Sequence, residues 1–98
     1  GHYMKLNKTK FITIAGCYGD LHIDDKGYFC IIHLSKTFGW KFHYDLSKTL
    51  TISAIVHNGI ENESNPLFMD FSITEEKLAE LLVKLNNLPN DVSTILRK

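Results

Sequence analysis

The chain has few cysteines, few prolines and no excess of charge, and each shortage removes a class of protein. Its 98 residues include two cysteines and two prolines, and eleven basic residues balance eleven acidic ones. Two cysteines are too few for a disulfide-built secreted miniprotein, so we expect Cys17 and Cys30 to be reduced thiols. A net charge of zero argues against a protein whose main task is to grip a phosphate backbone.

Long hydrophobic runs are also missing. No apolar stretch approaches the ~18 residues that a membrane-spanning helix needs, so we expect no contact with a membrane. The N-terminus lacks the basic-then-apolar pattern of a secretory signal, which favours a cytoplasmic protein. Residues 1–3 precede Met4 and are interpreted as an addition from cloning, leaving one globular domain over 4–98. The many lysines, asparagines and isoleucines suit a bacterial or phage genome.

What the chain does have is alternation of apolar and polar residues with period two, which is typical of half-buried strands. Three apolar sets are predicted to face inward: Trp40, Phe42, Tyr44 and Leu46; then Leu50, Ile52, Ala54 and Val56; then Leu67, Met69, Phe71 and Ile73. Polar or mixed residues face outward between them, among them Ile55 and Phe68.

The connections between these segments follow from turn chemistry. Asp24-Asp25-Lys26-Gly27 predicts a tight turn that joins strands near Leu21–Ile23 and Tyr28–Leu34. A three-residue loop, Ser47-Lys48-Thr49, keeps the apolar sets on one face by pairing Leu46 with Leu50 and Tyr44 with Ile52. A first strand is expected over Phe11–Ile14 after a frayed start, and the polar stretch Asn58–Pro66 is expected to be a mobile loop.

One helix is strongly predicted near the C-terminus. Thr74 is a suitable N-cap, with Ile73 and Leu78 in the positions of a hydrophobic staple. A leucine stripe at helical spacing follows, made of Leu78, Leu81, Leu82 and Leu85. Asn86-Asn87 and Pro89 should end the helix, and one or two further helical turns are expected over Asp91–Arg97. The predicted fold is therefore α+β: an antiparallel, curved sheet of about five to six strands with one C-terminal helix packed on one face.

Candidate catalytic and metal-ligating residues are sparse. His33 and His43 are expected on the same outward face of neighbouring strands, close enough for metal ligation if the register holds. A third ligand would have to be Asp45, His22 or Cys17, and no zinc-type spacing is present. Cys17 sits in a glycine-flanked loop without the spacing of a known cysteine hydrolase. We therefore predict no catalytic residue, no metal and no cofactor.

The outward face of the middle strands is the predicted contact surface, formed by Phe29, Ile31, His33, Lys41 and His43. The segment from Tyr28 to Leu34 is apolar on both faces, which implies that something covers the second face. The cover could be the N-terminal segment, the C-terminal tail, a second subunit or another partner.

These observations favour a small non-enzymatic binding protein that recognises another macromolecule, most simply a protein partner or a second copy. Inhibitors, immunity proteins and small regulatory subunits are often of this size. The alternative is a single-stranded nucleic-acid-binding domain that uses the open sheet face. In topology, strands followed by a helix that begins with Ser/Thr and Glu are similar to the single-strand-binding domains of some transcriptional coactivators. That function would require Lys5, Lys8, Lys10, Lys36 and Lys41 to converge on one groove.

Overall fold

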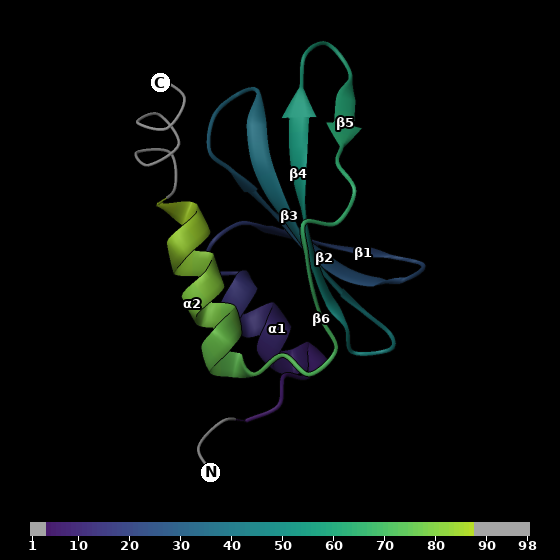
Figure 1. Cartoon of the computed structure of the whole chain (residues 1–98), viewed down its shortest axis with the longest axis vertical. Coiled ribbons are helices and arrows are strands. Elements are labelled where there is room, and N and C mark those ends of the chain that lie inside the picture. Colours follow the sequence, from purple (N-terminus) through teal and green to yellow (C-terminus); the bar gives the residue numbers. More distant parts are fainter. Residues whose placement is uncertain (1–3, 88–98) are drawn as a thin grey trace.

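An antiparallel sheet carries two helices against one of its faces (Figure 1). The computed structural model describes residues 4–87, so residues 1–3 and the predicted helical turns over 91–97 lie outside the described part. The elements are α1 (Lys8–Ala15), β1 (Asp20–Asp24), β2 (Gly27–His33), β3 (Phe38–Asp45), β4 (Leu50–His57), β5 (Glu61–Glu63), β6 (Phe68–Asp70) and α2 (Glu75–Asn86).

Five of the six strands follow one another in the sheet in the order β1-β2-β3-β4-β5, and the sixth, β6, also pairs with β4. β5 borders the end of β4 and β6 borders its beginning, so together they form one interrupted edge. The sheet twists strongly, since β4 runs nearly vertically in Figure 1 while β1 runs nearly horizontally. The predicted α+β fold, with an open sheet of five to six strands and a C-terminal helix, is confirmed.

The hairpin between β1 and β2 forms where the sequence predicts it. Asp24 pairs with Gly27, and its Oδ1 accepts hydrogen bonds from the amides of Lys26 and Gly27 at 2.9 and 2.8 Å. Gly27 has a φ of 153°, and a Cβ there would collide with the carbonyl oxygen of Tyr44. The position therefore requires glycine.

The hairpin between β3 and β4 has the predicted parity but a different register. Tyr44 pairs with Leu50 rather than with Ile52, so the loop is 46–48 instead of 47–49. The carboxylate of Asp45 decides this, because its Oδ1 accepts hydrogen bonds from the amides of Ser47 and Thr49. Leu46 consequently lies in the loop and is exposed, contrary to the predicted inward position.

The predicted first strand over Phe11–Ile14 is wrong, because this segment belongs to α1. Asn7 caps the helix by accepting a hydrogen bond from the amide of Lys10 at 2.9 Å. Phe11 and Ala15, four residues apart, are fully buried against the sheet and α2. This tertiary packing outweighs the strand preference of a segment rich in threonine and isoleucine.

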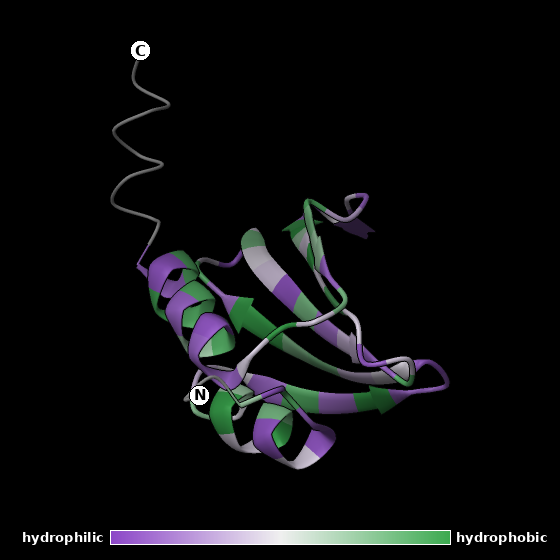
Figure 2. Ribbon diagram, turned by 60° about the horizontal axis from the view of Figure 1, so that its bottom comes forward, coloured by the Kyte–Doolittle hydropathy of each residue, from purple (hydrophilic) through white to green (hydrophobic). Residues whose placement is uncertain are grey.

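Helix α2 agrees with its prediction. Thr74 is the N-cap and accepts a hydrogen bond from the amide of Lys77 at 3.1 Å, and the helix ends at Asn86. Leu78 and Leu82 are fully buried. The helices lie together on one side of the sheet (Figure 2), and their apolar residues share one core with those of the strands: Leu6, Phe11, Ala15, Cys30, Ile32, Phe42, Tyr44, Leu50, Ile52, Ile73, Leu78 and Leu82.

The segment between β4 and α2 departs most from expectation. The predicted loop over Asn58–Pro66 contains β5, and the apolar alternation that follows it faces the other way. Phe68 pairs with Ile52 and packs against the core, while Leu67, Met69 and Phe71 are exposed. Four residues, 64–67, lie opposite only Ser53 and Ala54, so a bulge around Pro66 interrupts the edge without changing which parity faces the core.

Candidate functional site

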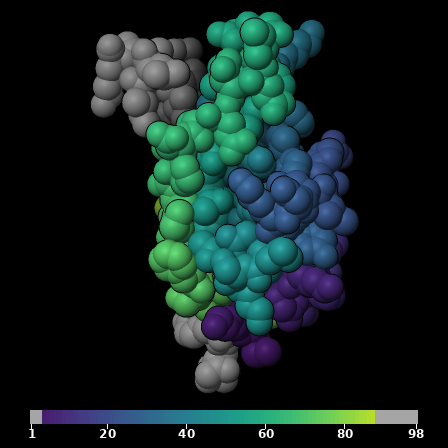
Figure 3. Space-filling model, turned by 90° about the vertical axis from the view of Figure 1, so that its right-hand side faces the viewer, coloured from purple at the N-terminus to yellow at the C-terminus, as the bar shows by residue number. Residues whose placement is uncertain are grey.

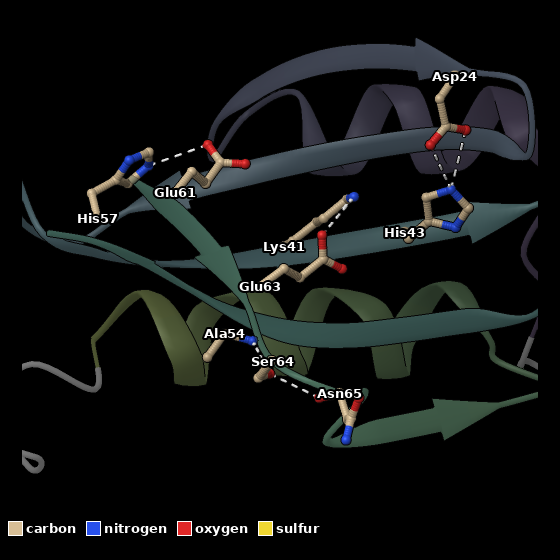
Figure 4. Close-up of polar contacts among 9 residues, drawn as sticks. All are labelled: Asp24, Lys41, His43, Ala54, His57, Glu61, Glu63, Ser64 and Asn65. Carbon is tan, nitrogen blue, oxygen red and sulfur yellow. Dashed lines mark hydrogen bonds and ion pairs between the residues drawn. The ribbon is translucent and has the colours of Figure 1, made fainter. Parts of the chain in front are cut away.

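The face of the sheet opposite α1 and α2, here called the helix-free face, has no described helix against it (Figure 4). The register of the strands assigns side chains to it, because directly paired residues share a face. From β1 to β6 it carries Asp20, His22, Asp24, Phe29, Ile31, His33, Lys41, His43, Thr51, Ser53, Ile55, Glu63 and Met69. Figure 3 looks onto this side of the molecule, with the β1–β2 hairpin in blue at one margin and the 64–73 segment in green at the other.

Three rings stand side by side across the first three strands. The ring of Phe29 on β2 stacks with His22 on β1 at a centroid distance of 4.9 Å, and with His43 on β3 at 6.3 Å. The ammonium of Lys41 also lies 4.5 Å from the Phe29 centroid. Because β2 lies between β1 and β3, both faces of the Phe29 ring are already occupied.

Lys41 and His43 on this face each lie against a carboxylate. Lys41 Nζ lies 3.1 Å from Glu63 Oε1 of β5, and His43 Nε2 lies 3.3 Å from both carboxylate oxygens of Asp24 (Figure 4). The side chains of Lys41 and His43 are only 18% and 15% exposed. The first contact connects β3 to β5, and the second connects β3 to β1. Together they leave little unpaired positive charge at the centre of this face.

Two carboxyl groups near His43 have shifted acidities. Burial works to raise the pKa of Asp24, but hydrogen bonds from Lys26 and His43, the charge of His43 and the amide of Gly27 outweigh it and lower the pKa. For Asp45, burial is likewise outweighed by hydrogen bonds from Ser47 and Thr49 and by the charge of His43, so its pKa is lowered too. Both groups are therefore stabilised as carboxylates.

A groove of about 330 Å³ crosses the helix-free face between the β1–β2 turn and Pro66. Its floor includes Lys41, His43, Thr51 and Ser53. Beyond Thr51, whose strand neighbour is Met69, three large side chains at alternate positions form what we call the apolar stripe: Leu67 (64% exposed), Met69 (52%) and Phe71 (71%). A polar groove thus adjoins a solvent-exposed apolar margin.

Four of the five predicted contact residues lie together on this face. Phe29 contacts His43 and Lys41, and Ile31 pairs with Lys41 across the strands. His33 pairs with Gly39 at the far end of β2, four residues from Phe29, which separates it from His43 by roughly 13 Å at ~3.3 Å per residue. The expected closeness of His33 and His43 is therefore wrong. Among residues 4–87, no three His, Cys, Asp or Glu side chains form a group that could hold a metal ion.

The two thiols have different surroundings. Cys17 is exposed after α1, and its Sγ donates a hydrogen bond to the carbonyl of Thr13 at 3.4 Å. Cys30 is buried and donates to the carbonyl of Ala15 at 3.3 Å. Burial, assisted by the charge of Asp20, raises the pKa of the Cys30 thiol to about 11. Neither sulfur makes a hydrogen bond to a histidine in the described part of the chain, so no thiol–imidazole pair forms there.

Sequence reasoning missed the apolar stripe, Asp24 and Glu63 as parts of this site. The alternation of Leu67, Met69 and Phe71 was visible, but it indicated a core-facing strand rather than an exposed surface. Pro66, which cannot donate to a strand ladder, indicated only an interruption of the edge. The pairing of Asp24 with His43 had no sign in the sequence, since it depends on the register of three strands.

No protein-family model, no curated protein and no solved structure matches this chain. Within residues 4–87, both helices are too short to cross a lipid bilayer.

Proposed function

We propose that the chain is a small non-enzymatic binding protein that docks another protein on its helix-free face. The apolar stripe carries this proposal, because Leu67, Met69 and Phe71 are each more than half exposed beside a polar groove. Apolar side chains gathered next to hydrogen-bonding groups are typical of protein interfaces. Phe29, Ile31, His33, Lys41 and His43 extend the contact surface from the groove toward β1 and β2. Inhibitors and regulatory subunits act by such a contact without chemistry of their own.

The ion pairs support a protein ligand because they hold the charged groups at the centre of this face in fixed positions. Lys41 and His43 are held by Glu63 and Asp24, so a partner meets fixed groups and little side-chain freedom is lost on binding. Both side chains are mostly buried, which reduces the cost of removing water from them.

The nucleic-acid alternative draws less support. Base stacking needs an open aromatic face, and both faces of Phe29 are occupied by His22, His43 and Lys41. The lysines do not form one patch either, because Lys10 lies 3.9 Å from Glu75 on the helical side while Lys41 is paired on the helix-free face. Fluorescence anisotropy with labelled oligothymidine at low salt should detect no binding. Binding with a steep salt dependence would favour this alternative instead.

The experiment for a protein ligand is affinity capture with matched variants, followed by reconstitution with the captured partner. Met69→Asp and Ile31→Asp alter the helix-free face, whereas Val83→Asp changes an apolar residue of similar exposure on α2. The partner should be retained by wild type and by Val83→Asp, and titration calorimetry should show at least about a tenfold loss of affinity for Met69→Asp. Equal affinity of all four proteins for the purified partner would contradict the proposal.

A further inference from the structure

Within residues 4–87 no strand pairs with the outer edge of β1, which lies beside an apolar hollow. We propose that this edge binds an extended segment of another protein in which large apolar residues alternate with lysine or arginine. This site lies at the opposite margin of the sheet from the apolar stripe, although Asp24 also borders the groove of the helix-free face. Its evidence comes from three features of β1: the direction of its backbone groups, the hollow on one side and the carboxylates on the other.

The backbone groups that point outward from β1 can be deduced from the ladder. The amide of Leu46 donates to the carbonyl of Lys26 at 2.9 Å, one step beyond the pair of Gly27 and Asp45. Even-numbered residues of β2 therefore bond to β3, and its odd-numbered residues bond to β1. Through the pairs Asp20–Ile31, His22–Phe29 and Asp24–Gly27, these three β1 residues point their backbone groups at β2.

Leu21 and Ile23 then direct their amides and carbonyls away from the sheet. No hydrogen bond within residues 4–87 takes up these groups from outside the ladder. An added strand would find two donors and two acceptors in one row, which is the arrangement used in β-strand addition.

The side chains of Leu21 and Ile23 lie on the helical side of the sheet, where α1 leaves a hollow uncovered. The hollow has a volume of about 380 Å³ and is lined by Ile12, Leu21, His22, Ile23 and Tyr28. Ile23 is 76% exposed. A second hollow of about 250 Å³ continues past Tyr28 to Leu46. Every second residue of an added strand would point into this apolar region.

The other side of the same edge is acidic. Asp20 and Asp24 lie on the helix-free face of β1, Asp25 follows in the turn, and the only lysine over residues 20–27 is Lys26. The intervening residues of an added strand would pass beside Asp20 and Asp24, where lysine or arginine is favoured by charge. Because successive residues of a strand point to opposite sides, a strand added to β1 should alternate apolar with basic residues.

A second copy of this chain satisfies that requirement less well. The antiparallel register that pairs Leu21 with the copy's Ile23, and so uses all the outward backbone groups, also sets Asp20 directly against the copy's Asp24, twice. Like charges in directly opposite positions destabilise a strand pair. The charge on the edge therefore favours a basic ligand over a homodimer.

The test uses three labelled octapeptides and fluorescence anisotropy. One alternates valine with lysine, one alternates valine with glutamate, and one has the lysine peptide's composition with the valines and lysines in separate blocks. We expect binding of the first alone, weakening as salt is added because the charges are exposed. Equal binding of the alternating and blocked lysine peptides would overturn the proposal, since a general attraction to acidic residues does not need period two.

Variants of β1 separate the backbone from the side chains. Asp20→Lys should weaken binding of the alternating lysine peptide by about fivefold. Ile23→Ala removes an exposed side chain but keeps the outward amide. Ile23→Pro removes the isoleucine side chain and the amide hydrogen. Because this amide points away from β2, its loss does not break the ladder between β1 and β2. Ile23→Pro should therefore bind at least about tenfold more weakly than Ile23→Ala. Far-ultraviolet circular dichroism checks that both fold.

Amide hydrogen exchange gives a readout that does not depend on any variant. The amides of Leu21 and Ile23 should exchange rapidly in the free protein and become protected when the lysine peptide is bound. Met69→Asp should leave this protection unchanged, which distinguishes failure at β1 from failure of the helix-free face. Peptide binding that does not protect these two amides would overturn the proposal. The proposal would also be overturned if the two amides were already protected in the free protein and sedimentation showed the free protein to be a dimer.

Discussion

The phenol of Tyr44 donates a hydrogen bond of 2.8 Å to the carbonyl oxygen of Leu6, 38 residues earlier in the chain. The same ring stacks with Phe11 of α1 at a centroid distance of 5.5 Å. Leu6 in turn donates its amide to Ile73 just before α2, at 3.0 Å. One side chain of β3 thereby connects the central sheet to the segment that leads into α1 and, through it, to the start of α2.

Removing the Tyr44 hydroxyl should destabilise the protein without changing its fold. In Tyr44→Phe the buried carbonyl of Leu6 loses its partner, and we expect the free energy of unfolding to fall by about 1–3 kcal/mol in urea denaturation. Tyr28→Phe is the matched control, because the Tyr28 hydroxyl makes no hydrogen bond within residues 4–87. Equal losses for both variants would show that the Tyr44–Leu6 bond contributes nothing specific.

The loop between β3 and β4 contains a correctable strain. Lys48 has a φ of 66° and is the only residue other than glycine with a positive φ in the described chain. Lys48→Gly should raise the free energy of unfolding by about 0.5–1 kcal/mol, since glycine adopts this conformation without a Cβ clash. Lys36→Gly, in an exposed loop of ordinary φ, should instead be neutral or slightly destabilising. A lower melting temperature for Lys48→Gly would contradict this account.

Acid should destabilise the fold partly through Asp45 and Asp24. Their folded-state pKa values are lowered from 3.8, so the stability that they contribute is present above this value and is lost as the pH falls through the lowered folded values. The midpoint of urea denaturation should therefore drop between neutral pH and about pH 3.

Asp45→Asn tests the contribution of charge in this acid response. Asparagine keeps an acceptor for the amides of Ser47 and Thr49 but cannot ionise, so the variant should be less stable at neutral pH and lose less on acidification. Asp25→Asn, at an exposed turn position, should keep the acid response of the wild type. An unchanged response in Asp45→Asn would exclude Asp45 as a source.

The two thiols should react at very different rates with a disulfide reagent such as Ellman's. Cys17 is exposed and should react quickly, whereas Cys30 is buried with its pKa raised to about 11, which leaves little thiolate near neutral pH. In the native protein one thiol should therefore react rapidly, releasing one equivalent of the reagent's coloured thiolate. The second thiol should react only on unfolding. Cys17→Ser should abolish the rapid phase, and two equally fast phases would contradict the assigned burial.

Much of the candidate site was predictable because one face of β2 and β3 follows from parity alone. Phe29, Ile31, Lys41 and His43 share a face whatever the register, provided that the strand parity is right. The distance between His33 and His43 depends on the register of β2 and β3, and the prediction that they lie close together was wrong. The apolar stripe was predicted to face the core because Leu67, Met69 and Phe71 alternate with residues that are mostly polar. The pairing of Met69 with Thr51 and of Phe68 with Ile52 places it on the opposite face.

Elements whose signals lie within a few residues of one another could be predicted from the sequence alone. The Thr74 cap and the leucine stripe specify α2, and the carboxylate of Asp24 with Gly27 specifies the first hairpin, because their hydrogen bonds and packing are local. Three features could be seen only in the folded chain: the helical conformation of Phe11–Ile14, the exposure of Leu67, Met69 and Phe71, and the contact between His43 and Asp24. Each of these depends on contacts between segments far apart in the chain, where burial against α2 or the register of a neighbouring strand outweighs local preference.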